Sequence, residues 1–123
     1  MSSLLIVEDS ATTRALIRNV IEEIGEDLTT TEAASGFEAL KLLPTDEFDI
    51  IITDINMPDI NGLELINFVK TNPRYNHIPV IIVTTERSKE DKERGLALGA
   101  SAYVTKPFQP KELQDAVIHI LKR

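Results

Sequence analysis

Short apolar runs recur along the chain and predict the strands of a sheet. Four of them, residues 4–7, 48–52, 80–83 and 102–104, consist almost entirely of aliphatic and aromatic side chains. Short continuous runs of this kind are typical of strands that are covered on both faces. A fifth segment, residues 27–33, alternates weakly and is rich in threonine, which predicts a modest strand at an edge of the sheet.

Helical periodicity fills the intervals between these runs. The first interval carries an apolar stripe that comprises Leu16, Ile17, Val20, Ile21 and Ile24. Gly25 follows this stripe, and we expect it at the C′ position just beyond the helix. The second interval predicts a short helix over residues 36–43 that is stopped by Pro44. Its expected inward residues are Phe37, Leu40 and Leu43.

Three more helices are predicted further along. One follows a loop over residues 57–62, buries Leu63, Ile66 and Val69, and ends near Pro73. Residues 87–94 carry seven charges in eight positions, with Ser88 and Asp91 spaced as a capping box. That helix has little apolar surface, so we expect it to be the most weakly attached to the sheet of the five predicted helices. The last, residues 110–121, has its apolar stripe at Leu113, Ala116, Val117, Ile120 and Leu121.

Strands that alternate with helices in this way predict an α/β fold. Right-handed crossovers place the helices on both faces of a doubly wound parallel sheet. The length of 123 residues suits one domain, and the hydrophobic fraction of 42% and the charged fraction of 27% are those of a globular protein. The first strand begins close to Met1 and the fifth helix closes the chain, so we expect a stand-alone protein; an output domain outside these residues stays open.

Composition excludes several classes of protein. The chain has no cysteine, which rules out disulfides and thiolate sites and favours a cytoplasmic location. Its apolar runs fall far short of the roughly 20 residues that span a bilayer, and the amino terminus lacks a signal-peptide pattern. The net charge of −7 and the isoelectric point near 4.8 argue against direct nucleic-acid binding, which depends on clustered Lys and Arg.

Candidate chemistry gathers where the predicted strands end. Glu8 and Asp9 follow the first run, Asp54 follows the central one, Thr84 and Thr85 follow the next, and Lys106 follows the last. Because the carboxyl ends of parallel strands share one edge, we expect these groups to meet there. Three carboxylates, two hydroxyls and one amine suit a metal-dependent phosphoryl transfer.

The carboxylates point to a hard cation. Two such groups repel each other by about 4 kcal/mol at roughly 4 Å and an effective dielectric of about 20. Oxygen ligands without cysteine favour Mg²⁺, with Mn²⁺ as an alternative. The simpler interpretation of Glu8 and Asp9 is that they open a loop and cap the first helix. Likewise, Asp54 could cap a turn instead of acting as a nucleophile, and a lone Lys106 could be a solvated charge.

Together these residues resemble the receiver domain of two-component response regulators, most closely its single-domain chemotaxis (CheY-like) type. The resemblance covers essentially the whole chain, residues 1–123, as one receiver domain. Its motifs are Ile6-Val7-Glu8-Asp9-Ser10, Gly36-Phe37-Glu38-Ala39-Leu40, Thr53-Asp54-Ile55-Asn56-Met57-Pro58 with Asn61-Gly62, Thr84, Gly99-Ala100, and Tyr103-Val104-Thr105-Lys106-Pro107-Phe108. No single motif is decisive, but their joint order and spacing are highly specific.

The resemblance implies a flavodoxin-like (βα)5 fold with a five-stranded parallel sheet of order 2-1-3-4-5. It implies that Asp54 accepts a phosphoryl group from the phosphohistidine of a histidine kinase or from a small acyl phosphate. Mg²⁺ would be held by Asp9, Asp54 and the backbone carbonyl of Asn56, with Glu8 acting through water. Lys106 would pair with the acceptor carboxylate, and its bond to the following proline would be cis.

The resemblance also implies a signalling switch. Thr84 would bond a phosphoryl oxygen, and Tyr103 would turn inward as Thr84 moves. The surface of the fourth helix, last strand and fifth helix would then change for a downstream protein target. The chain would be a monomer without membrane insertion, with dimerisation on phosphorylation left open. It would not be an ordinary enzyme, since it would catalyse only its own phosphorylation and slow dephosphorylation.

Some positions depart from the commonest family pattern. Glu8 stands where many members have Asp, Asn61 replaces a frequent Asp, and Thr85 is bulkier than the usual residue. The longer Glu8 would alter metal affinity, and Thr85 would narrow phosphate access. Asn56 and Glu86 occupy positions that tune the lifetime of the acyl phosphate in the family.

Two rival functions stay open. Phosphohydrolases that form an aspartyl phosphate generally carry a second acid two residues after the nucleophile, where this chain has Asn56. A receiver-like binding module that never takes phosphate would usually lack one of the key residues, and here all are present. A nucleotide-binding flavodoxin-like protein is disfavoured because no glycine-rich phosphate loop follows the first strand.

We expect no functional role for His77 or His119, which have no second ligand nearby in the sequence.

Overall fold

The computed structural model describes residues 2–25, 27–85 and 89–122. Within them, five parallel strands form one sheet in the order β2-β1-β3-β4-β5. The strands are β1 (Ser2–Val7), β2 (Leu28–Ala33), β3 (Ile50–Thr53), β4 (Val80–Thr85) and β5 (Ala102–Lys106). The expected flavodoxin-like order is therefore confirmed, and so is the edge position of the threonine-rich strand β2.

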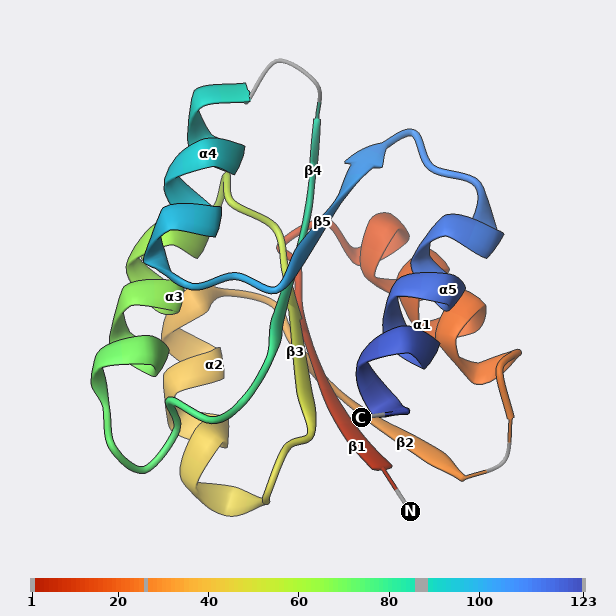
Figure 1. Cartoon of the computed structure of the whole chain (residues 1–123), viewed down its shortest axis with the longest axis horizontal. Coiled ribbons are helices and arrows are strands. Elements are labelled where there is room, and N and C mark those ends of the chain that lie inside the picture. Colours follow the sequence, from red (N-terminus) through yellow and green to blue (C-terminus); the bar gives the residue numbers. More distant parts are fainter. Residues whose placement is uncertain (1, 26, 86–88, 123) are drawn as a thin grey trace.

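Helices cover both faces of the sheet (Figure 1). On one face lie α1 (Ala11–Glu22) and α5 (Pro110–Leu121), and on the other lie α2 (Gly36–Leu42), α3 (Gly62–Thr71) and α4 (Lys89–Leu98). A short 3-10 turn, η1 (Leu43–Thr45), follows α2. Across the described residues, none of the helices combines the length and apolar character that crossing a membrane requires.

The sheet separates two hydrophobic cores. Along β1, Leu4 and Ile6 pack with the buried faces of α1 and α5, whereas Leu5 and Val7 pack with those of α2 and α3. Successive side chains of a strand point to opposite faces of the sheet. A strand that contributes side chains to both cores must therefore be apolar at every position. This requirement explains the unbroken apolar runs of the central strands.

Strand limits differ from the sequence prediction at the ends. β3 begins at Ile50 instead of Phe48, while β4 continues through Thr85 and β5 through Lys106. In the β4–β5 ladder, Thr84 pairs with Thr105 and Thr85 pairs with Lys106. Backbone pairing does not require apolar side chains, so polar residues with a chemical role can still be strand residues.

The predicted end of the first helix was wrong. α1 ends at Glu22, and its cap is Glu23, whose backbone N–H donates to the carbonyls of Asn19 and Ile21. Gly25 does not adopt the left-handed conformation that a C′ glycine uses. Among the described residues that conformation belongs to Gly99, with φ of 117°, directly after α4.

Two apolar side chains that were expected to face inward are exposed. Leu16 on α1 is 51% exposed and Phe37 on α2 is 54% exposed. The amine of Lys41 lies 4.7 Å from the centre of the Phe37 ring and covers part of it. The fourth predicted helix does present little apolar surface: its buried residues, within the described part of α4, are Lys92 and Gly95. The predicted capping role of Ser88 lies outside the described residues.

Candidate functional site

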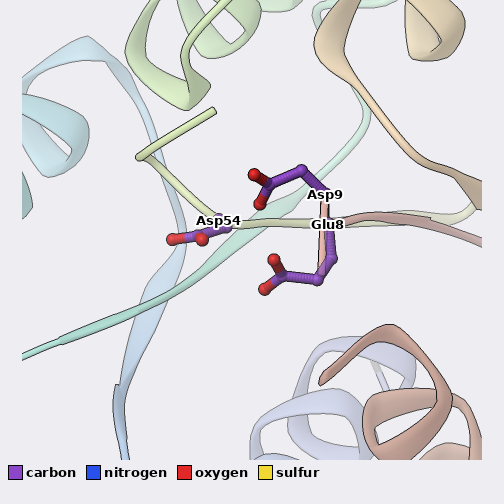
Figure 2. A group of neighbouring side chains, drawn as sticks. All are labelled: Glu8, Asp9 and Asp54. Atoms are coloured by element: carbon purple, nitrogen blue, oxygen red, sulfur yellow. The ribbon is translucent and has the colours of Figure 1, made fainter. Parts of the chain in front are cut away.

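The three predicted carboxylates meet at the carboxyl edge of the sheet. β1 ends at Val7 and β3 ends at Thr53, and these two residues are partners in the ladder. Glu8 and Asp9 follow one, and Asp54 follows the other, so neighbouring strands deliver them to the same place. Each carboxylate offers an oxygen, and these oxygens lie within 4.8 Å of one another (Figure 2).

This cluster fits a hard divalent cation. All three side chains offer oxygen, the donor that Mg²⁺ and Mn²⁺ prefer. Glu8 is 1% exposed and Asp54 is 8% exposed, whereas Asp9 lies at the surface. Repulsion between such close negative charges is weakly screened in this setting, so a bound cation would stabilise the arrangement.

Lys106 supplies the one positive charge that directly contacts the carboxylates within the described residues. Its Nζ donates to Glu8 Oε1 at 2.8 Å and to Asp54 Oδ2 at 3.3 Å. Burial by itself would lower the pKa of Lys106, but the hydrogen bonds and charges of Glu8 and Asp54 together raise it. The side chain therefore stays an ammonium group. The expected cis bond between Lys106 and Pro107 is present.

Glu8 is held at both carboxylate oxygens. One accepts from Lys106, and the other accepts from the backbone N–H of Ser10 at 3.1 Å. Burial raises the pKa of Glu8, the bonds from Lys106 and Ser10 lower it, and the nearby charge of Asp54 raises it further, with a net increase.

Asp54 is fixed by its neighbours on both sides. Its backbone N–H donates to the Val7 carbonyl at 3.1 Å, which continues the β1–β3 pairing beyond the last ladder pair. Its side-chain Oδ1 accepts from the N–H of Ile55 at 2.7 Å, while Oδ2 faces the Lys106 amine. A carboxylate that is immobilised and nearly buried in this way can present one oxygen in a defined direction, as a nucleophile must.

Thr84 lies on β4, the strand beside β3, and its side chain is fully buried. Its hydroxyl has no hydrogen-bond partner among the described residues. Buried hydroxyls nearly always have a partner, so this one is available to a group that the resting protein does not contain. The next residue, Thr85, is exposed.

The other residues that the sequence singled out have exposed side chains. The side chain of Asn56 is exposed. The Tyr103 ring is 47% exposed on β5, and the Lys92 amine lies 5.1 Å from the centre of the ring. His77 and His119 are both exposed.

Sequence reasoning missed two basic residues beside the site. Arg14 on α1 donates to the backbone carbonyl of Glu8, and Lys92 on α4 donates to the Thr105 hydroxyl next to Lys106. Both are basic residues of amphipathic or charged helices, where a solvated side chain is the normal expectation. Their roles depend on contacts with distant strands, and the local pattern carries only a weak signal of these.

Comparison with known proteins gives a consistent result. The family model described as the response regulator receiver domain matches residues 4–118. A chemotaxis protein CheY homologue of Campylobacter jejuni is 40% identical over 119 residues, which cover 96% of this chain and 91% of the relative. The solved structure of the chemotaxis response regulator CheY4 of Vibrio cholerae has a TM-score of 0.85 and 35% identity, with 98% of each chain covered.

A third relative was solved with a metal. The structure of the Mn²⁺-bound form of the response regulator Rcp1 has a TM-score of 0.83 and 27% identity to this chain. The match covers 98% of this chain and 91% of that one.

Proposed function

This chain belongs to the response regulator receiver domain family, whose members are phosphorylation-activated signalling switches, and we propose that Asp54 is its phosphoacceptor. The observation that supports the assignment is the fixed Asp54 carboxylate, which contacts the Lys106 amine and lies close to two further acids at one sheet edge. The whole of residues 1–123 would then act as one receiver domain.

In the proposed reaction, an Asp54 carboxylate oxygen attacks phosphorus. The new O–P bond forms as the P–N bond of a kinase phosphohistidine breaks and the imidazole leaves; with acetyl phosphate, the P–O bond breaks and acetate leaves. Asp9, Asp54 and the Asn56 backbone carbonyl would hold Mg²⁺, or Mn²⁺ as in the Rcp1 structure, with Glu8 acting through water. When bound, such an ion would supply neutralisation of charge on the phosphoryl group and on the attacking oxygen.

Lys106 and Thr84 are suited to receive the product. The Lys106 amine already contacts Asp54 at 3.3 Å. It can therefore exchange the free carboxylate for a phosphoryl oxygen as its partner without leaving the site. The buried Thr84 hydroxyl, which has no partner among the described residues, would donate to another phosphoryl oxygen. Neither Lys106 nor Thr84 has to give up a proton in this reaction. Lys106 would act by its charge, and both would act by hydrogen bonding.

We propose that this contact drives the signal. Movement of Thr84 toward the phosphoryl group opens space that the exposed Tyr103 ring fills, and the surface of α4, β5 and α5 changes for a protein target. The activating kinase would be a histidine kinase, and the switch would act in the cytoplasm as a monomer. Phosphorylation would shift an existing equilibrium between two conformations.

Intact-mass analysis after incubation with acetyl phosphate tests the proposal. We expect one phosphoryl addition that requires Mg²⁺, is labile to base, and is lost in Asp54→Asn. Asp49→Asn is the matched control, because Asp49 lies at the opposite end of β3 and accepts from the Ser3 N–H at 2.8 Å. A label that persists in Asp54→Asn would move the acceptor elsewhere. Sustained release of phosphate from a monoester would instead favour a phosphohydrolase.

A further inference from the structure

The loop that carries the acidic pair is held through the backbone of Glu8. The Glu8 N–H donates to the Ala33 carbonyl at the end of β2, at 3.0 Å. The Glu8 carbonyl accepts from Arg14 Nη1 at 2.8 Å. Asp9 follows directly, and its side chain is exposed at the surface. The position of the Asp9 carboxylate therefore depends on how firmly the preceding peptide is fixed.

Arg14 is itself fixed from the other side. Its Nε donates to Glu32 Oε1 on β2 at 3.1 Å, and its side chain is 19% exposed. The guanidinium presents its N–H groups in a rigid plane, so it can bind a carboxylate with one edge and a carbonyl with another. One side chain thus joins α1, the edge strand β2 and the loop between β1 and α1.

We propose that Arg14 is a positioning residue for the cation site. By binding the Glu8 carbonyl, it holds the loop in the conformation in which Asp9 reaches the cation beside Asp54. Its hydrogen bonds go to Glu32 and to the backbone, so it acts through the loop and not on the cation. Partners that orient metal ligands in this way commonly decide metal affinity. The inference rests on the proposed metal-dependent function of this site.

Arg18 provides a matched control within the same helix. It lies one turn after Arg14, and its Nη1 donates to the other oxygen of Glu32 at 2.9 Å. Replacing Arg18 removes the same charge and an ion pair with the same carboxylate, but it leaves the Glu8 carbonyl bonded. A purely structural link between α1 and β2 would make the two arginines equivalent. A positioning role would make only Arg14 matter for the cation.

The experiment is calorimetric titration of Mg²⁺ into the unphosphorylated wild type and three variants. We expect Arg14→Met to weaken Mg²⁺ binding about tenfold. Arg14→Lys should weaken binding similarly, because an ammonium keeps the charge but lacks the planar pair of donors. Arg18→Met should stay within about twofold of the wild type, as expected for a partly exposed ion pair. Amide hydrogen exchange at Asp9 and Ser10 should accelerate in the Arg14 variants alone.

The possible outcomes distinguish the positioning role of Arg14 from the proposed metal-dependent function of the site. Equal Mg²⁺ affinity in Arg14→Met and Arg18→Met would overturn the positioning role while the metal site stands. A wild type that does not bind Mg²⁺ would overturn the metal site and the positioning role together. Urea unfolding of each variant establishes that it is folded, and if Arg14→Met does not fold, Arg14→Lys decides the comparison with Arg18→Met.

Discussion

Two buried threonines near the site differ in one respect. Thr53 and Thr84 both have fully buried side chains. The Thr53 hydroxyl donates to the Asp54 carbonyl at 2.8 Å, whereas the Thr84 hydroxyl has no partner in the described part of the chain. An unpaired buried hydroxyl costs about 1–3 kcal/mol relative to one that is paired or hydrated. A Thr84 hydroxyl without a partner would carry this cost in the resting protein.

Valine substitution tests this cost. Thr84→Val keeps the shape of the side chain and removes the unpaired hydroxyl, so we expect the free energy of unfolding of the unphosphorylated protein to rise by about 1 kcal/mol. Thr53→Val removes a hydroxyl that has a partner, and we expect a fall of about 1 kcal/mol. Urea denaturation of both variants measures the two values. A loss of stability in Thr84→Val would mean that its hydroxyl is already satisfied in solution.

At the scale of single elements, α4 is attached in an unusual way. Its buried residues among those described are Lys92 and Gly95, and Lys92 is 8% exposed. The Lys92 amine donates to the Thr105 hydroxyl on β5 at 2.7 Å and lies against the Tyr103 ring. A buried lysine thus joins α4 to β5 and also supports the outward position of Tyr103.

We expect Lys92→Met to weaken this outward position. The hydrogen bond and the cation–π contact are each worth about 1 kcal/mol, and losing 1 kcal/mol shifts a two-state equilibrium about fivefold. Acrylamide quenching of tyrosine fluorescence should fall, because the only other tyrosine, Tyr75, is 9% exposed. Lys89→Met is the control, since Lys89 is exposed on the same helix. Quenching that falls equally in both variants would exclude a specific role for Lys92.

The sequence predicted the elements well because their buried faces repeat regularly. The last helix was predicted as residues 110–121, and α5 is Pro110–Leu121. The edges of apolar stripes were predicted less well. The predicted stripe on α1 begins at Leu16, but the residues of this helix that are buried are Ile17, Val20 and Ile21. A helix that packs on a flat surface buries a narrow line, and the flanking positions remain exposed.

The candidate site was predictable for a different reason. Its acids directly follow the strands β1 and β3, and Lys106 is the last residue of β5. Parallel strands bring their carboxyl ends to one edge of the sheet whatever the conformation of the loops. Side chains that reach the site from a helix could not be placed. Arg14 contacts Glu8 and Glu32 only because α1 crosses beside β2, and that crossing is a property of packing and not of the local sequence.

For the whole molecule, Glu32 makes stability depend on pH. The hydrogen bond from Arg18, followed by its charge and the contacts from Arg14, lowers the pKa of Glu32 below its ordinary value of 4.5 despite partial burial. A carboxyl whose pKa is lower in the folded state stabilises the fold above the ordinary value. That contribution disappears as the pH falls through the lowered pKa.

Comparison of the wild type with Glu32→Gln tests this dependence. At pH 7 we expect the free energy of unfolding of Glu32→Gln to be about 1 kcal/mol lower than that of the wild type, because a neutral amide pairs less strongly with two arginines than a carboxylate does. The difference should shrink as the pH falls below about 4.5, where the unfolded wild type takes up a proton at this carboxyl, and it should vanish below the lowered pKa of the folded state. Urea unfolding at several pH values measures it. Glu22→Gln, at an exposed ion pair of 3.7 Å, should show little difference at any pH.

The contact between Lys106 and Glu8 joins residues that are 98 positions apart in the chain. A nascent chain that has been synthesised only as far as β4 has its acids but lacks the amine, which lies on β5. Such a copy cannot complete the pocket, and neither can a copy truncated before β5. Only molecules that have folded through β5 therefore bring the acids and the amine together in one pocket.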